Sequence, residues 1–306
     1  MLPNIVRRLL MLIPVLLGVS IVVFSIVHII PGDPARIMAG VDATGEEIEL
    51  IRRQLDLDKP VYIQYFLWMS KVLTGDLGRS IVTNQPVLPE IIHRFSATLQ
   101  LTLAAIILAV LMGVTVGVVS ATKPYSLFDH LSMVSALFGV SMPIFWMGLM
   151  FIFLFSVTLG LFPSSGKDGI EHIVLPALTL GLASTGIIAR MTRSSMLEVL
   201  GQDYVRTARA KGATEDDVVY RHALKNAMIP IVTIVGLQFG YLLSGAVLTE
   251  TVFNWPGIGR LMVDSIFNRD FPMIQGAVLL VASSFVFVNL LTDLLCAYLD
   301  PRVKFE

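Results

Sequence analysis

Long apolar runs separated by shorter polar stretches dominate the chain. No run alternates apolar and polar residues with a period of two, which excludes a membrane β-barrel, and backbone groups in lipid then require helices. Each run is close to or above the roughly 20 residues that a helix needs to cross the hydrocarbon core. The pattern predicts an all-α integral membrane protein with a single domain, 1–306, and six transmembrane helices. The predicted spans are 9–30, 98–120, 131–159, 173–189, 229–249 and 277–299.

The composition agrees with this pattern. Of the 306 residues, 55% are hydrophobic and 15% are charged, and the mean hydropathy is +0.77. Soluble domains carry about 25% charged residues, so a soluble enzyme domain is excluded. The first run is longer than the apolar core of a signal peptide, so we expect a retained anchor. The single cysteine, Cys296, excludes a disulfide within the chain and is expected to be a small buried apolar side chain.

The positions of Lys and Arg predict the orientation. With the N-terminus inside, the cytoplasmic segments hold twelve of the 22 basic residues, and the short outer loops hold only Lys167, Arg260 and Arg269. The other seven lie in the outer segment 31–97, whose length weakens the positive-inside rule. We therefore expect both termini in the cytoplasm, together with a cytoplasmic loop at 190–228.

The outer segment contains signals for two helices. TGEE at 44–47 has the spacing of a capping box, which predicts a short helix after it. The stretch 60–75 begins with proline, ends with glycine and mixes aromatic with apolar residues. It is expected either to lie at the bilayer interface or to pack against the outer ends of the spans.

Two residues interrupt the apolar spans. Pro143 removes a backbone donor within the third span and is expected to bend it. Asp293 is the only formal charge in the six runs. We expect it to hydrogen-bond near the cytoplasmic end of its helix rather than to act as a gate.

Small residues recur four positions apart in two spans, which permits close contact between helices. Gly113 and Gly117 are expected to pack the bundle internally. The row Gly236, Gly240 and Ser244 is expected either to do the same or to line a partner interface or a passage.

Motifs for catalysis and for metal binding are incomplete. SSGKDG at 164–169 lacks the glycine spacing and the Ser or Thr of a phosphate loop, and PGIGRL at 256–261 lacks the third glycine of a dinucleotide site. The five histidines are scattered without the spacing of a metal site. We therefore expect a non-catalytic chain that binds no metal and no cofactor.

The most polar part of the predicted cytoplasmic loop has clear helix signals. GQDYVRTARAKG at 201–212 reads as a short helix that begins near Asp203 and ends at Gly212, which can adopt the left-handed conformation. Thr214 and Asp217 have the spacing of a cap for a second helix. A solvated charged loop would explain the polarity but not this capping.

These residues resemble a known family. TARAKG at 207–212 and RHALKNAMIP at 221–230 are similar to the EAA-type cytoplasmic loop of binding-protein-dependent ABC importer permeases. Arg206 and Thr207 stand where that pattern has Glu and Ala, and Lys225 stands where it has proline. Resemblance to the peptide and nickel permease subfamily covers nearly the whole chain, in HIIPGDPAR at 28–36, ETVFNWPGIGRLMVDSI at 250–266, NRDFPMIQG at 268–276 and DPR at 300–302.

The resemblance implies a type I ABC importer permease fold in a bacterial or archaeal cytoplasmic membrane. The implied partners are the lipid bilayer, a second homologous permease, an extracytoplasmic solute-binding protein and two cytoplasmic ATPases that hold ATP and Mg²⁺, with no nucleic acid. The implied substrate is a short peptide, such as a dipeptide, an oligopeptide or glutathione. The close alternative is a nickel or metal-chelate importer, and the remote ones are a self-contained channel and an intramembrane enzyme.

Two groups of residues follow as candidates. The resemblance assigns contacts with the ATPase to Asp203, Tyr204, Arg206, Thr207, Ala208, Arg209, Ala210, Lys211, Gly212 and His222. Polar residues in the spans suggest a translocation path lined by Ser141, Gln238 and Ser244, with Glu250 and Asn254 to Arg260 near its outer mouth.

Overall fold

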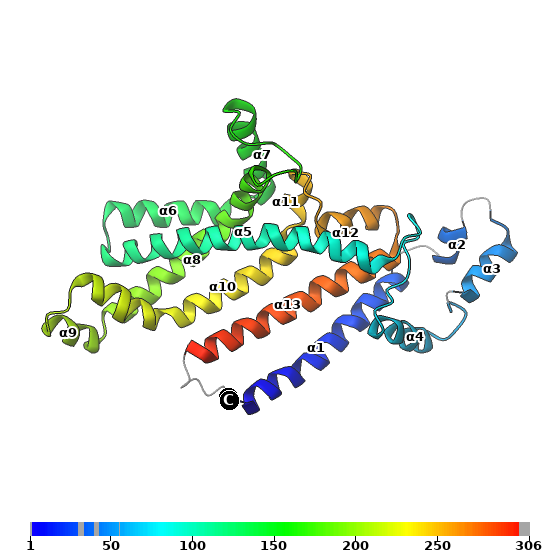
Figure 1. Cartoon of the computed structure of the whole chain (residues 1–306), viewed down its shortest axis with the longest axis horizontal. Coiled ribbons are helices and arrows are strands. Elements are labelled where there is room, and N and C mark those ends of the chain that lie inside the picture. The colour runs from blue at the N-terminus through cyan, green and yellow to red at the C-terminus, as the bar shows by residue number, and fades with distance from the viewer. Residues whose placement is uncertain (1, 30–33, 40–42, 55, 300–306) are drawn as a thin grey trace.

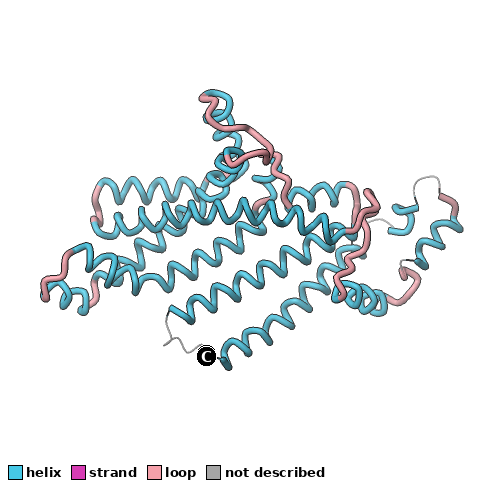
Figure 2. Tube along the Cα trace, viewed as in Figure 1, coloured by secondary structure: helices cyan, strands magenta, loops and turns pink. Residues whose placement is uncertain are grey.

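Helices make up most of the chain in the computed structural model, which describes residues 2–29, 34–39, 43–54 and 56–299. Short loops connect them (Figure 2), and an isolated antiparallel bridge pairs Arg79 with Pro86. Long helices lie alongside one another in a bundle (Figure 1). They are α1 (Leu2–Ile29), α5 (Val87–Thr122), α8 (Glu171–Leu200), α10 (Lys225–Gly245) and α13 (Phe271–Leu299).

Shorter helices lie at the two ends of the bundle (Figure 1). At one end are α2 (Pro34–Ala39), α3 (Gly45–Gln54), α4 (Val61–Leu73) and α12 (Ile258–Phe267), with α11 (Val247–Val252) preceding α12. The other end carries α9 (Asp203–Ala210) and the π-helix η2 (Asp217–Leu224).

A helix occupies each of the six predicted runs. Among the described residues, four helices are long and apolar enough to cross a membrane, namely Val87–Thr122, Glu171–Leu200, Asp217–Ser244 and Phe271–Tyr298. The third run forms a bent pair that could supply a fifth span, and the apolar part of α1 found within the described residues is shorter, Leu10–Ser25. The all-α membrane fold is confirmed, while the count of six spans stays a prediction.

The third run is more than kinked. Residues Leu127–Ser141 form α6, Ile144–Phe151 form α7, and the π-helix η1 (Ile152–Thr158) continues from it. The two halves meet at 106°, with Pro143 as the residue that precedes α7. The second half, α7 with η1, projects from the bundle (Figure 1), and its Phe153 side chain is 62% exposed. The bend expected at Pro143 is confirmed.

Both rows of small residues include glycines that pack helices together. A Cβ on Gly117 would lie 2.5 Å from Cβ of Thr192, so α5 touches α8 there as expected. Gly236 faces Thr292 and Gly240 faces Phe285, so these two glycines seat α10 on α13 rather than lining a passage.

Helices α3 and α4 follow the local signals. Thr44 and Glu47 form the expected capping box, in which the Thr44 N–H donates to Glu47 Oε2 at 2.8 Å. Helix α4 packs against α1, where the Tyr65 ring lies 5.4 Å from that of Phe24 and its hydroxyl is 2.8 Å from Ser20 Oγ. Of the two expectations for 60–75, packing against a span is therefore observed.

Candidate functional site

The end of the bundle opposite α4 is formed by α9 and η2, which connect α8 to α10 (Figure 1). Helix α9 begins at Asp203, as its sequence predicts. Gly212 has a φ of +86°, the left-handed conformation that ends the α9 turn. The Asp217 N–H then donates to Thr214 Oγ1 at 3.2 Å, so the predicted second cap is also present.

The inner side of this segment is apolar and buried. Val205 of α9 and Val218 of η2 are both fully buried. Val219 belongs to a cluster of buried side chains that also contains Met196 of α8 and Val118 of α5. Burial of apolar area on this scale fixes η2 to the long helices, and the buried Val205 shows that the inner side of α9 is covered as well, so the segment does not behave as a loose loop.

Two sets of polar contacts hold α9 against the residues that flank η2, namely Asn226 at the start of α10 and Glu215 just before η2. Asn226 Nδ2 donates to Tyr204 Oη at 2.8 Å and to the His222 carbonyl at 2.9 Å. Across the Gly212 turn, the Arg209 guanidinium donates to both carboxylate oxygens of Glu215, at 2.8 and 3.2 Å. That bidentate contact lowers the pKa of Glu215 and raises the pKa of Arg209.

The outer side of α9 is available to a partner. Among the ten predicted ATPase contacts, Ala208 and His222 are half-buried. The exposed ones are Asp203, Tyr204, Arg206, Thr207, Arg209, Ala210, Lys211 and Gly212. We call these eight residues the coupling surface. The coupling surface is an exposed, charged protrusion on a segment that is held by buried contacts. Such a surface is suited to binding a partner protein rather than to catalysis.

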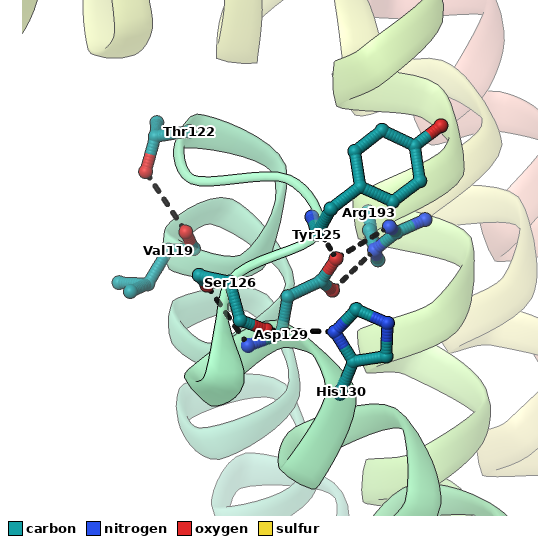
Figure 3. A network of polar contacts seen from close by, with 7 residues as sticks. All are labelled: Val119, Thr122, Tyr125, Ser126, Asp129, His130 and Arg193. Carbon is teal, nitrogen blue, oxygen red and sulfur yellow. Dashed lines mark hydrogen bonds and ion pairs between the residues drawn. The ribbon is translucent and has the colours of Figure 1, made fainter.

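An ion pair that no local sequence pattern predicts lies near the same end of the bundle. Arg193 Nε and Nη2 of α8 donate to Asp129 Oδ1 and Oδ2 of α6, each at 2.6 Å (Figure 3). The Asp129 side chain is only 3% exposed, and it also accepts the Tyr125 N–H at 2.9 Å. The Ser-x-x-Asp spacing of Ser126 and Asp129 signals the cap at the start of α6, but nothing local in the sequence identifies Arg193 as the partner.

A second polar cluster lies between α5, α11 and α12. Thr98 Oγ1 donates to Glu250 Oε1 at 2.5 Å and accepts the Ile258 N–H at 2.8 Å. Glu250 Oε2 accepts the Arg260 N–H at 2.9 Å, and Trp255 Nε1 donates to the Ala97 carbonyl at 2.9 Å. These contacts fasten the loop between α11 and α12 onto α5.

This cluster places the Glu250 side chain inside the protein. The side chain is fully buried and hydrogen-bonded, and its position near the outer mouth of a path stays a prediction. A Cβ on Gly257 or Gly259 would collide with the Glu250 carboxyl group, which explains the two glycines of PGIGRL. Arg260 Nη1 also donates to Asn254 Oδ1, so the structure brings these two predicted path residues together with Glu250.

The other candidates for the path do not join this cluster. Ser141 Oγ donates to the Leu137 carbonyl within α6 at 2.9 Å, and Gln238 Oε1 accepts from Ser184 Oγ at 3.0 Å. Ser244 lies in a separate groove of about 780 Å³ between α1, α10 and α13, which Asp293 also lines. The path therefore stays a prediction.

No group of three His, Cys, Asp or Glu side chains suited to a metal ion occurs within the described residues. Cys296 is buried and free, and its Sγ lies 3.3 Å from Thr233 Oγ1, in line with the apolar environment expected from the sequence.

Comparison with known proteins connects both ends of the chain to transport. The family model described as the N-terminal part of a binding-protein-dependent transport system membrane component matches residues 1–102. The model described as "Binding-protein-dependent transport system inner membrane component" matches residues 113–305. A dipeptide transport system permease protein from Alkalihalophilus pseudofirmus and a glutathione transport system permease protein from Escherichia coli are each 48% identical to this chain, with 100% of both chains covered.

Solved structures show a related fold at low sequence identity. A methionine ABC transporter in an inward-facing conformation aligns with a TM-score of 0.59 at 18% identity, over 69% of this chain and 96% of that one. An amino acid ABC transporter aligns with a TM-score of 0.52 at 17% identity, over 70% of this chain and 94% of the other. At these identities the likeness concerns the fold alone.

Proposed function

This chain belongs to the family of binding-protein-dependent transport system inner membrane components, and on that premise we propose that it is the membrane-spanning subunit of an ATP-driven importer of short peptides. Its relatives over the full length are named as dipeptide and glutathione permeases, which supports a peptide over a nickel chelate as substrate. The chain itself is a transport component rather than an enzyme, and it resides in the cytoplasmic membrane.

The observation that carries the proposal is the coupling surface. Helix α9 buries Val205 on its inner side, is bonded to Asn226 of α10 and to Glu215, and exposes charged residues on its other side. A self-contained channel does not need a surface that binds an ATPase. An ATPase that received α9 would move α8 and α10 together with it, because α9 directly follows α8, Tyr204 of α9 is bonded to Asn226 of α10, and the apolar cluster around Met196 joins α8 to α10.

The full assembly proposed here contains two cytoplasmic ATPases, which bind ATP and Mg²⁺, a second homologous permease and an extracytoplasmic solute-binding protein. Both termini and the coupling surface face the cytoplasm, as the basic residues of the cytoplasmic segments suggest. Closure of the ATPases on ATP would bias the spans between inward-open and outward-open states, since a ligand shifts the state that it binds better.

Reconstitution of the complete assembly in vesicles tests the proposal. ATP inside should drive uptake of a labelled dipeptide or of glutathione in the presence of the binding protein, and vesicles that hold the permease chain alone should take up neither. ATP-independent flux through the isolated chain would favour a channel instead. Titration of the binding protein with peptides and with Ni²⁺ chelates separates the two importer classes, because tight chelate binding without peptide binding contradicts the peptide assignment.

A further inference from the structure

The ion pair between Asp129 and Arg193 lies between the coupling surface and the bent third run. Arg193 is on α8 about two turns before that helix ends at Leu200, and α9 starts just afterwards. Asp129 is in the first turn of α6, the helix that leads to the Pro143 bend and the projecting half beyond it. A displacement of α9 therefore acts on this pair before it acts on the contacts of α8 with α6 that lie nearer the N-terminal end of α8.

Close packing continues the contact between the two helices. A Cβ on Gly186 of α8 would lie 2.6 Å from the Ala136 carbonyl of α6, and a Cβ on Gly139 of α6 would lie 3.6 Å from the Leu182 carbonyl of α8. Together with the ion pair, these contacts join α6 to α8 at three levels along its length. Two helices held in this way move as one body rather than sliding past each other.

The chemistry of the pair suits positioning better than stabilisation. A buried ion pair often contributes little net stability, because removing both charges from water costs about as much as their attraction returns. A bidentate contact, however, fixes both the distance and the angle between its groups. Tyr125 and Ser126 hold the Asp129 residue from its other side, so the carboxylate has one orientation (Figure 3).

We infer that Asp129 and Arg193 form a positioning contact that transmits the movement of α9 through α8 to α6 and the bent half, α7 with η1. The inference rests on the proposed function, because it presumes that an ATPase moves α9. Loss of the contact would let α8 move while α6 lags behind. ATP would then be hydrolysed with fewer peptides imported.

The test uses the complete reconstituted assembly with Asp129→Asn, which removes the charge, and Arg193→Lys, which keeps the charge but loses the bidentate geometry. The exposed Arg190 on the same helix provides the matched control, Arg190→Lys. We expect both test variants to assemble and to keep peptide-stimulated ATP hydrolysis within about twofold of the parent. Peptide uptake should fall by about tenfold, a size typical of coupling between two sites, and the control should change neither quantity.

Uptake and hydrolysis that fall in proportion, or variants that fail to assemble, would reduce the pair to a structural role and overturn the inference. An unchanged ratio of peptides imported to ATP hydrolysed would do the same. The parent assembly separates this failure from that of the proposed function: if the parent imports no peptide, the function is wrong, whereas normal import by parent and variants alike contradicts only the transmission.

A distance measurement adds a readout that a purely structural role would not move. Spin labels are placed at two exposed positions, Val134 on α6 and Asp216 beside η2, in a protein whose Cys296 is replaced by Ser. The distance between the labels reports whether α6 moves together with η2. The distance between the labels should be the same with and without ATP in the parent. In Asp129→Asn it should differ between the two states, and a constant distance in that variant would contradict the inference.

Discussion

The hydroxyl of Thr98 donates to Glu250 Oε1 at 2.5 Å and at the same time accepts the backbone N–H of Ile258 at 2.8 Å. One buried side chain on α5 thereby fixes both the last turn of α11 and the first turn of α12. Thr98, Glu250 and Ile258 are all essentially inaccessible to solvent, so water cannot replace either bond.

Thr98→Val should therefore destabilise the end of the bundle where α11 and α12 meet α5. The substitution keeps the shape but removes the donor to the buried Glu250 Oε1 and the acceptor of the buried Ile258 N–H, at a cost of about 1–3 kcal/mol. Thermal unfolding of the purified protein in detergent should show a melting temperature lower by several degrees. Thr98→Ser retains the hydroxyl and should melt close to the parent, and equal melting of the two variants would disprove the assignment.

Charge reversal at Lys211 tests the coupling surface more cleanly than reversal at Arg209. The Lys211 side chain is exposed, whereas Arg209 also holds Glu215 within the chain. Lys211→Glu should weaken association with the ATPases by about tenfold or more, measured by co-purification and by ATP hydrolysis stimulated with peptide-loaded binding protein. Membrane insertion should not change.

Glu215, the partner of Arg209, allows a second set of variants in the same experiment. Arg209→Glu should impair coupling through two losses, the docking charge and the bond to Glu215, and adding Glu215→Arg should restore only the internal bond. If the double variant regained full coupling, Arg209 would be a support for α9 and not a contact with the ATPase.

The pH dependence of the α9 turn follows from Glu215. Its pKa lies below the ordinary value of 4.5, chiefly because of the hydrogen bonds from Arg209. A carboxyl group with a lowered pKa contributes stability that is present above its unfolded pKa and is lost as pH falls through the folded one. The contact between Arg209 and Glu215 should thus be intact at neutral pH and be lost only at acidic pH below 4.5. Carbon-13 NMR of labelled Glu should show the Glu215 midpoint rising in Arg209→Gln, and an unmoved midpoint would contradict the pairing.

Gly117→Val should separate α5 from α8. Even a Cβ at this position would lie 2.7 Å from the Ala189 carbonyl, so the larger side chain cannot fit without moving the helices. We expect a loss of about 1–3 kcal/mol or more in stability, seen as a lower melting temperature. Gly18→Ala, at a position with nothing within 4 Å of the new Cβ, is the matched control and should have little effect.

Features specified by neighbouring residues were predictable from the sequence. The Gly212 turn, the Thr214 cap, the Thr44 capping box and the Pro143 bend each depend on side chains within a few positions. The apolar runs also located the long helices, because burial in lipid demands a continuous apolar surface. The 106° angle itself was not predictable, since proline sets only where a helix breaks and packing decides the direction.

Features that join distant parts of the chain were not predictable. Asp129 and Arg193 are 64 positions apart, and Thr98 and Glu250 are 152 apart. Glu250 was expected near the outer mouth of the path, and no local pattern in the sequence reveals the buried donors that hold its side chain inside the protein. Its two neighbouring glycines were a usable signal, because they mark a site where backbone approaches another group closely.

Thr98 and Ile258 are 160 positions apart, so they are synthesised at different times. A ribosome adds about 5–20 residues per second, so roughly 10 to 30 seconds pass between the synthesis of the two. During that interval Thr98 can turn its hydroxyl back to the Arg94 carbonyl of its own helix, a contact that persists at 3.5 Å in the finished protein. The Thr98 hydroxyl can thus stay bonded within α5 while the rest of the chain is made, and exchange this temporary bond for the permanent one once α12 has been made.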